Sequence, residues 1–274
     1  MTFGQVRASS EWLALREPAD AASRSPELVE EIRSHLPTDG RVAVHDLGCG
    51  TGSMARWLAV QLIGPQHWVM YDRDADLLAV AAANPPQQAS DGAPVTIETR
   101  PRDITRLIPA DLEGAGLITA SALLDMMTAD ELERLIATCS RAGCPVLVAL
   151  SVTGHVDLTP TDPFDQRVTD AFNAHQRRTT VAGRLLGPDA VGAAVEGFSR
   201  LGIGVLVRPS PWRLGPDQAA LAVEWFTGWY GAACEQEPDL RAVDPSYERR
   251  RLAEATAGRL SVTVHHQDLL VGPR

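Results

Sequence analysis

The sequence predicts an α/β fold with a doubly wound, mostly parallel sheet. Between residues 42 and 151, strand-like apolar runs alternate with segments that have helical spacing. This alternation is typical of βαβ units, with helices on both faces of a sheet. The run Val146-Leu147-Val148-Ala149-Leu150 is continuously apolar, as expected of a parallel strand that is covered on both faces. In such a sheet, ligands bind at the carboxyl ends of the strands.

Strand and helix patterns alternate until the last third of the chain, where helices dominate. The expected strands cover residues 42–47, 67–71, 95–99, 116–120, 145–151, 205–208 and 260–265. The expected helices cover residues 54–63, 75–83, 128–140, 163–178, 188–200 and 216–257. The last third therefore carries extra helices that the βαβ alternation does not need.

Charge and composition indicate an enzyme-sized globular protein that does not bind nucleic acid. The 274 residues are 45% apolar and have a formal net charge of −10. The basic clusters Arg177-Arg178 and Arg249-Arg250-Arg251 are short and lie near acidic residues. Because a protein that grips nucleic acid needs a positive surface, we expect a small-molecule ligand instead.

Cysteine usage and the apolar runs indicate a cytoplasmic protein. The four cysteines, Cys49, Cys139, Cys144 and Cys234, form neither a CxxC pair nor a regular disulfide framework. We find no signal-peptide pattern and no apolar run near the roughly 20 residues that span a bilayer. We therefore expect reduced thiols and no membrane partner.

A glycine-rich turn follows the first expected strand and opens a helix. It reads Asp46-Leu47-Gly48-Cys49-Gly50-Thr51-Gly52-Ser53. Such a turn lets a ligand approach the backbone closely, and either a dinucleotide or S-adenosylmethionine would fit it. The dinucleotide pattern requires its third glycine at the position of Ser53, whereas here that glycine is Gly52. The acidic Asp46, two residues before the first glycine, also favours S-adenosylmethionine, which carries an ammonium group.

The string Val-Ala-Val-His-Asp-Leu-Gly-Cys-Gly-Thr-Gly resembles motif I of the class I S-adenosylmethionine-dependent methyltransferases. This resemblance implies a Rossmann-like, seven-stranded sheet whose last strand is antiparallel. It also implies acidic residues after the second and third strands, which hold the ribose hydroxyls and face the adenine. Asp72 and Asp103 stand at those places. The cofactor-binding residues implied in this way are Asp46, Gly48, Cys49, Gly50, Gly52, Asp72, Arg73, Asp103 and Ile104.

Further strings resemble a bacterial group of class I methyltransferases whose acceptor is not securely assigned. They are Gly64-Pro65-Gln66-His67-Trp68, then residues 119–125, then residues 172–178. Ser121, at the end of the fourth strand, is expected to touch the cofactor. Arg24 is expected to reach its methionyl carboxylate, and the amphipathic segment 11–17 is expected to form a lid.

Two residues are the candidates for acceptor chemistry. Asp125 follows the fourth strand, where a carboxylate can orient an acceptor or take its proton. Its alternative role is to cap the helix that begins near residue 128. His175 lies in a polar set and titrates near neutrality, although a packed or solvated histidine is equally consistent with the sequence. We expect Asp125 and His175 to face one pocket.

No metal site is predicted, because the candidate ligands do not converge in the sequence. His265 and His266 are adjacent in a strand, so they point to opposite faces. His155 and Asp157 share a face of an extended segment, but two ligands alone make a weak site. Trp225 and Trp229 share a helix face, either in the core, at a subunit interface or as the wall of an acceptor pocket.

We expect one class I methyltransferase domain over residues 1–274. It comprises an N-terminal helical cap (1–36), a cofactor-binding core (37–152) and substrate-side helices with closing strands (153–274). The expected reaction transfers a methyl group from S-adenosylmethionine to a small-molecule acceptor (EC 2.1.1.-), giving S-adenosylhomocysteine and a methylated product. The alternatives are an NAD(P)-dependent oxidoreductase and a non-catalytic S-adenosylmethionine-binding protein, and a homodimer is possible.

Overall fold

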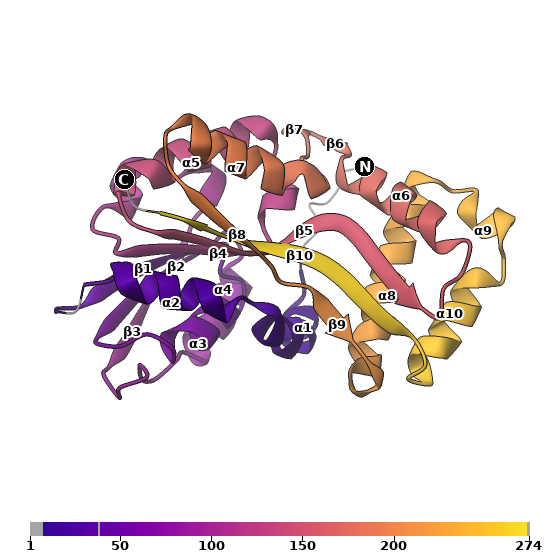
Figure 1. Ribbon diagram of the computed structural model, residues 1–274, viewed down its shortest axis with the longest axis horizontal. Coiled ribbons are helices and arrows are strands. Elements are labelled where there is room, and N and C mark those ends of the chain that lie inside the picture. The colour runs from indigo at the N-terminus through magenta and orange to yellow at the C-terminus, as the bar shows by residue number, and fades with distance from the viewer. Residues whose placement is uncertain (1–7, 38, 273–274) are drawn as a thin grey trace.

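A twisted sheet of eight strands forms the centre of the protein, in a computed structural model that describes residues 8–37 and 39–272 (Figure 1). The strands follow the order β3-β2-β1-β4-β5-β10-β8, and β9 pairs with β10. Their bounds are β1 Val42–Leu47, β2 Gln66–Asp72, β3 Val95–Pro101, β4 Leu117–Ser121, β5 Val146–Thr159, β8 Val205–Pro209, β9 Trp212–Leu214 and β10 Ser261–Val271. A separate small hairpin pairs β6 Thr179–Thr180 with β7 Gly183–Arg184.

The direction of the strands confirms the predicted fold class. Strands β1 to β5 pair in parallel, and the closing strand β10 is antiparallel to β5, β8 and β9. The seven strands of the main path are the seven predicted from the sequence. Strand β9 was not predicted, since three residues are too short to show an alternating pattern.

Helices pack on both faces of the sheet and extend beyond it in the C-terminal third (Figure 1). The α-helices are α1 Ser10–Ser23, α2 Pro26–His35, α3 Ser53–Ala59, α4 Ala75–Ala83, α5 Ala129–Ala142, α6 Asp165–Gln176, α7 Ala190–Arg200, α8 Ala219–Gln236, α9 Leu240–Val243 and α10 Tyr247–Thr256. Short 3-10 turns are η1 Ile104–Arg106, η2 Pro109–Leu112, η3 Leu124–Met126, η4 Gly187–Asp189 and η5 Pro216–Gln218. Among the described residues, none of these helices has the length and apolar character needed to cross a membrane.

The single helical stretch predicted over 216–257 is divided by two prolines. Glu237 precedes Pro238 and has φ −129° and ψ 85°, and Asp244 precedes Pro245 with φ −134° and ψ 87°. Both pre-proline residues are extended because the proline ring clashes with a helical conformation of the residue before it. The stretch therefore folds back on itself, and α10 packs against α8.

Strands β5 and β10 are much longer than predicted and form a ribbon that extends past the other strands (Figure 1). A bulge interrupts their pairing between the pairs Val264–Val156 and His266–Val152, where Gly154 has φ +77°. One face of the ribbon packs on a core that includes Val264, Phe226 and Trp229. Residues 152–159 largely alternate between apolar and polar side chains, which is the pattern of a half-exposed strand, so the predicted strand 145–151 ended too early.

A buried carboxylate connects three elements where the ribbon leaves the sheet. Asp268 of β10 is 1% exposed, and its two oxygens accept hydrogen bonds from the backbone N–H groups of Ser25 (2.8 Å) and Leu150 (2.7 Å). Burial raises the pKa of Asp268, and the hydrogen bonds from the two backbone donors oppose that shift. Leu150 has a φ of +56°, which is strained for a residue with a side chain. Asp268 therefore joins the start of α2 to a strained residue of β5.

Replacing Asp268 with Ala should destabilise the protein by about 2–6 kcal/mol, because two buried N–H groups lose their acceptor at about 1–3 kcal/mol each. Urea denaturation measures the free energy of unfolding. The exposed Asp217→Ala is the matched control and should change that energy little. Equal stabilities for the two variants would contradict the role given to Asp268.

Candidate cofactor and acceptor site

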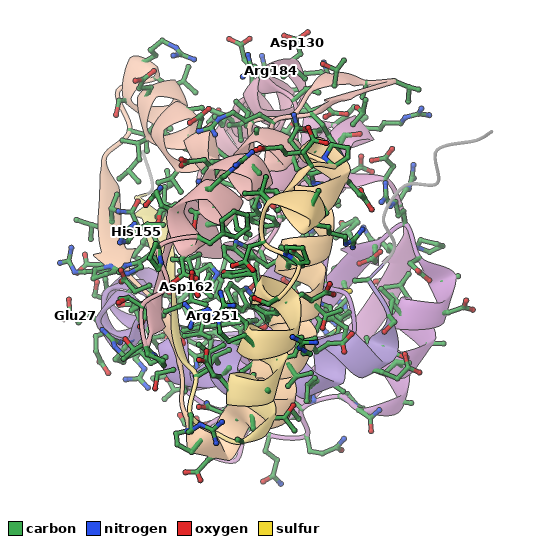
Figure 2. All side chains as sticks on the ribbon, turned by 90° about the vertical axis from the view of Figure 1, so that its right-hand side faces the viewer. Glu27, Asp130, His155, Asp162, Arg184 and Arg251 are labelled. Carbon is green, nitrogen blue, oxygen red and sulfur yellow. The ribbon has the colours of Figure 1, made fainter. Side chains whose placement is uncertain are left out.

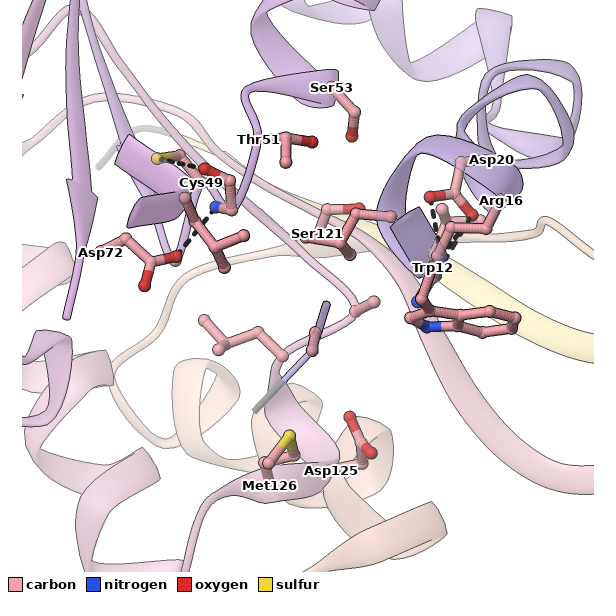
Figure 3. Close-up of a pocket in the computed structure, with 18 of the residues that line it drawn as sticks. Trp12, Arg16, Asp20, Cys49, Thr51, Ser53, Asp72, Ser121, Asp125 and Met126 are labelled. Carbon is pink, nitrogen blue, oxygen red and sulfur yellow. Dashed lines mark hydrogen bonds and ion pairs between the residues drawn. The ribbon is translucent and has the colours of Figure 1, made fainter. Parts of the chain in front are cut away.

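A cavity of about 1040 Å³ opens at the carboxyl ends of β1, β2 and β4. Strand order reverses between β1 and β4, and open α/β sheets bind ligands at such a point. One end of the cavity is lined by the glycine-rich turn and the other by residues of α1, α6, α8 and the β5–β10 ribbon. In Figure 3, Asp72 and Cys49 lie on one side and Trp12, Arg16 and Asp20 of α1 lie on the other.

The glycine-rich turn has backbone angles that require glycine. Gly50 has φ +54°, and a Cβ there would lie 3.1 Å from the Leu13 side chain of α1. Gly48, Cys49 and Gly50 line the cavity. Gly52 has φ +86° but is not among the lining residues. It caps the start of α3 and therefore shapes the turn.

Asp72 holds the turn in place and faces the cavity (Figure 3). One carboxylate oxygen accepts a hydrogen bond from the Gly50 N–H and the other from the Asp74 N–H, both at 2.9 Å. Each oxygen has two lone pairs, so Asp72 can still accept hydrogen bonds from a ligand. The neighbouring Arg73 is exposed and also lines the cavity.

Asp103 and Ile104 line the same end of the cavity. Asp103 accepts a hydrogen bond from the Thr105 N–H at 3.0 Å and so caps the η1 turn. Ile104 is 9% exposed and presents an apolar side chain beside that carboxylate. Together they offer an apolar contact and an acceptor, which suit a purine ring.

Asp46 is a buried carboxylate with spare hydrogen-bonding capacity. It is 1% exposed, and Thr119 donates its hydroxyl to one oxygen at 2.7 Å. The other oxygen has no partner among the residues that the structure describes. Burial raises the pKa of Asp46 to about 6, although the Thr119 hydrogen bond and the charge of Arg24 oppose the shift. A cationic ligand would stabilise its ionised form.

Arg24 lies behind the cavity lining, and this departs from the prediction that it touches the cofactor. Its guanidinium is 2% exposed and donates to the hydroxyls of Ser53 (3.1 Å) and Ser121 (3.2 Å). Ser53 and Ser121 themselves line the cavity. Burial lowers the pKa of Arg24, opposed by Asp20 and other nearby carboxylates. Arg24 therefore supports the lining serines from below.

Aromatic side chains form the wall of the far end of the cavity. Five of them line it: Trp12, Phe172, Trp212, Trp225 and Trp229. The rings of Trp225 and Trp229 are stacked with centroids 5.2 Å apart and an interplanar angle of 18°. Trp229 is 2% exposed and also belongs to the core. The pair therefore belongs both to the core and to the wall of the pocket.

A charged pair from α1 borders the aromatic wall. Arg16 binds Asp20 through its Nε at 3.0 Å, and the Trp212 indole N–H donates to Asp20 at 3.0 Å. The Arg16 guanidinium also lies 4.8 Å from the centre of the Trp212 ring. This arrangement orients Trp212 and satisfies the Asp20 carboxylate, which would otherwise be a costly buried charge.

His266 of β10 also lines the cavity, with its ring centre 5.5 Å from that of Trp212. Burial lowers the pKa of His266 to about 3, so the imidazole is neutral at physiological pH. Its Nδ1 has no partner among the described residues. Sequence reasoning missed His266 and Asp20 as site residues. The sequence offered one signal for His266. It stands two residues before Asp268, so a buried strand carries two polar residues.

The two candidate acceptor-binding residues are separated by the structure. Asp125 lies in η3 and lines the cavity beside Met126 (Figure 3), and burial raises its pKa. Thr128, not Asp125, caps α5. The prediction that His175 faces the same pocket is wrong. His175 points from α6 to Glu235 of α8, with its Nε2 3.1 Å from the carboxylate, and Phe172, one turn earlier, lines the cavity.

Comparison with known proteins identifies a methyltransferase domain in part of the chain. The family model for a methyltransferase domain matches residues 44–145, which run from β1 through α5. No curated protein sequence matches the chain. The glycine-rich turn and the strand order agree with this match, so residues 44–145 form a methyltransferase domain whose cofactor is S-adenosylmethionine.

Solved structures share the fold over nearly the full chain. The cyclopropane synthase MmaA2 from Mycobacterium tuberculosis is similar with a TM-score of 0.50 and 12% identity, over 96% of this chain and 94% of that one. A putative type II methyltransferase from Anaeromyxobacter dehalogenans has a TM-score of 0.50 and 19% identity, over 92% of this chain and 97% of that one. At these identities the similarity shows the fold alone.

Asp46 should make stability depend on pH. Its pKa is 3.8 in the reference state and about 6 in the fold, so the folded state holds the proton more tightly. The stabilisation is complete below about pH 4 and is lost as the pH rises to about 6, a change of about 3 kcal/mol. The free energy of unfolding of the wild type minus that of Asp46→Asn, measured in urea at pH 4 and pH 7, should fall by about this amount. An unchanged difference would show that burial does not perturb Asp46.

Proposed function

We propose that this protein transfers the methyl group of S-adenosylmethionine to a small-molecule acceptor that has a flat apolar part. One observation carries the proposal: a single cavity joins the glycine-rich turn and Asp72 at one end to Trp225 and Trp229 at the other. Its volume of about 1040 Å³ lies at the upper end of the range for small-molecule pockets, about 300–1,000 Å³, so it has room for a cofactor and an acceptor together.

The residues at the first end fit S-adenosylmethionine. Asp72 would accept hydrogen bonds from the ribose hydroxyls, and Asp103 with Ile104 would flank the adenine. The unpartnered oxygen of Asp46 offers an anionic acceptor near the turn. Ser121 and Ser53, held by Arg24, supply hydroxyls beside it. The donor and acceptor pattern therefore matches a ligand with ribose hydroxyls and an ammonium group.

The chain's main contribution to catalysis is positioning. When bound, S-adenosylmethionine supplies an electrophilic methyl group on a sulfonium. The aromatic wall and the apolar side chains Val152, Val156 and Met127 exclude water from the space beside it. Holding two reactants in line can supply about 7–11 kcal/mol of the barrier, so a dedicated nucleophile is unnecessary.

Asp125 is the residue that we assign to the acceptor, as an orienting group or proton acceptor. Its raised pKa means that burial makes it more basic than an exposed aspartate. His266 remains neutral and offers a hydrogen-bonding ring nitrogen beside Trp212 of the aromatic wall. His175 has no part in this scheme, because Glu235 holds it away from the cavity.

The net charge and the free cysteines indicate the partners and the compartment of the protein. A net charge of −10 disfavours nucleic acid as the acceptor, and the cysteines, all of which are described, are free thiols, which fits a reducing compartment such as the cytoplasm. The homodimer stays a prediction. So does the division of residues 1–274 into a cap, a core and a substrate-side region. Residues 1–7 of the cap lie outside the described part.

Turnover tests the proposed function. The purified chain is incubated with methyl-labelled S-adenosylmethionine and a panel of aromatic alcohols, amines and acids, and mass spectrometry should detect S-adenosylhomocysteine with a labelled product. Asp125→Asn should then lower kcat by about 10²–10⁴-fold while cofactor affinity is unchanged. A melting temperature raised by NAD but not by S-adenosylhomocysteine would favour the oxidoreductase alternative. Binding of S-adenosylhomocysteine without any labelled product would favour a non-catalytic binding protein.

Asp72→Ala should weaken S-adenosylhomocysteine binding by about 1.5–3 kcal/mol, because the ribose hydroxyls lose a charged acceptor. Isothermal titration calorimetry measures the change. Asp91→Ala is a closely matched control, since Asp91 also accepts two backbone hydrogen bonds, from Gly64 (3.0 Å) and Ala93 (3.1 Å), but does not line the cavity. Equal affinities in the two variants would contradict the role given to Asp72.

A further inference from the structure

Three side chains with metal-binding atoms meet on the β5–β10 ribbon. His155 and Asp157 come from β5, and His265 comes from β10. The Nε2 of His265 lies 2.7 Å from one Asp157 oxygen, and the Nε2 of His155 lies 3.3 Å from the other. One ligand atom from each residue can be chosen so that all three lie within 4.8 Å of one another. The structure therefore adds the third ligand that the sequence pair His155 and Asp157 lacked.

These side chains lie on the face of the ribbon opposite the cavity. Val156, Val264 and His266 line the cavity, and neighbouring residues in a strand point to opposite faces. His155, Asp157 and His265 therefore point outward, and Figure 2 places His155 at the surface of the molecule. Their side chains are 64%, 57% and 37% exposed. A metal ion can reach them from solvent.

The backbone brings the three residues together in a fixed way. His155 and Asp157 are two residues apart in one strand, and the pairing of Val156 with Val264 places His265 beside them. The bulge at Gly154 re-aims this part of β5, and Thr153 donates its hydroxyl to the His265 carbonyl at 3.1 Å. The imidazole rings of His155 and His265 end with centroids 4.6 Å apart. Ligands on paired strands are held more rigidly than ligands on loops.

The separations suit a small divalent ion. Zinc bonds of about 2.0–2.1 Å in tetrahedral geometry place ligand atoms about 3.3 Å apart. The imidazole nitrogens lie 2.7 Å and 3.3 Å from the two different Asp157 oxygens, and three ligand atoms, one from each residue, lie within 4.8 Å of one another, so rotations of the exposed side chains can bring them to this spacing. Two imidazoles and a carboxylate are donors that zinc and related transition metals accept, whereas Mg²⁺ and Ca²⁺ prefer oxygen alone.

Charges near the cluster are mixed. The Asp157 carboxylate lies between the two imidazoles, one on each oxygen. Arg213 of β9 faces Thr263 in the register next to Asp157 and is exposed, so it weakens the attraction for a cation without blocking access. The competing interpretation is an ion-pair cluster of two imidazoles around one carboxylate, without a metal.

We propose that His155, Asp157 and His265 bind a divalent transition-metal ion of the zinc type, with the remaining coordination positions taken by water. The ion joins β5 to β10 on the outer face, while Val156, Val264 and His266 line the cavity on the inner face. It therefore stabilises the ribbon that forms the acceptor end of the cavity. This site does not depend on the proposed methyltransferase function.

Calorimetric titration of the untagged chain with zinc chloride tests the site, in a buffer that does not chelate metals. The wild type should bind one equivalent that His155→Ala or His265→Ala weakens. Since loss of a residue that only supports a ligand costs about 10–100-fold in metal affinity, loss of a ligand should cost at least as much. His67→Ala is the matched control, because His67 is a strand histidine 3.6 Å from Glu98 that is not part of this cluster. It should bind zinc as the wild type does.

The melting temperature gives a second readout. Zinc should raise it in the wild type and in His67→Ala, and should raise it less in Asp157→Asn and His155→Ala, while Mg²⁺ should have no such effect. His155 is the most exposed of the three, so its variant keeps the fold and remains informative if His265→Ala is unstable. The proposal is overturned if zinc does not bind, or if the wild type and the ligand variants bind it equally. Either result leaves an ion-pair cluster only.

Discussion

The carboxylate of Asp268 is the interaction on which the rest of the structure depends. It accepts backbone hydrogen bonds from Ser25, where α2 begins, and from Leu150, where β5 leaves the parallel sheet. The same junction places Arg24, the residue before Ser25, under Ser53 and Ser121. Because Leu150 has a positive φ, the strand changes direction here and continues as the long ribbon. One buried charge thus connects the N-terminal helices, the sheet and the ribbon.

The two ends of the cavity are built in different ways. The cofactor end comes from short loops that follow β1, β2 and β3, and its key contacts, such as that of Asp72 with Gly50, join neighbouring strands. The acceptor end requires α1, α8 and β10, which are far apart in the sequence. Its aromatic wall is also core, so the shape of the cavity and the stability of the fold are coupled through Trp229. A substitution in this wall would therefore affect packing as well as the cavity.

Buried groups of opposite charge lie close together around the cavity. Arg24 is surrounded by Asp20, Asp46 and Asp268, whose charges partly offset the cost of burying the guanidinium. Asp46 keeps an oxygen without a partner among the described residues, and this group faces a ligand site rather than the core. A buried polar group without a partner is costly in a purely structural role. Its place at the glycine-rich turn gives that cost a functional reason.

The sequence alone determined the strands of the sheet and the glycine-rich turn, because these depend on patterns within short segments, and the resemblance to class I methyltransferases supplied the antiparallel direction of the closing strand. The glycine spacing and Asp72 and Asp103 after successive strands are local features, and parallel strands bring their carboxyl ends to one edge. Only the tertiary structure decided that His266 lines the cavity while His175 pairs with Glu235, and that His265 joins His155 and Asp157. The direction of a helical side chain depends on which neighbour the helix packs against. The meeting of β5 and β10 residues depends on a register that a bulge shifts, and neither is encoded in local periodicity.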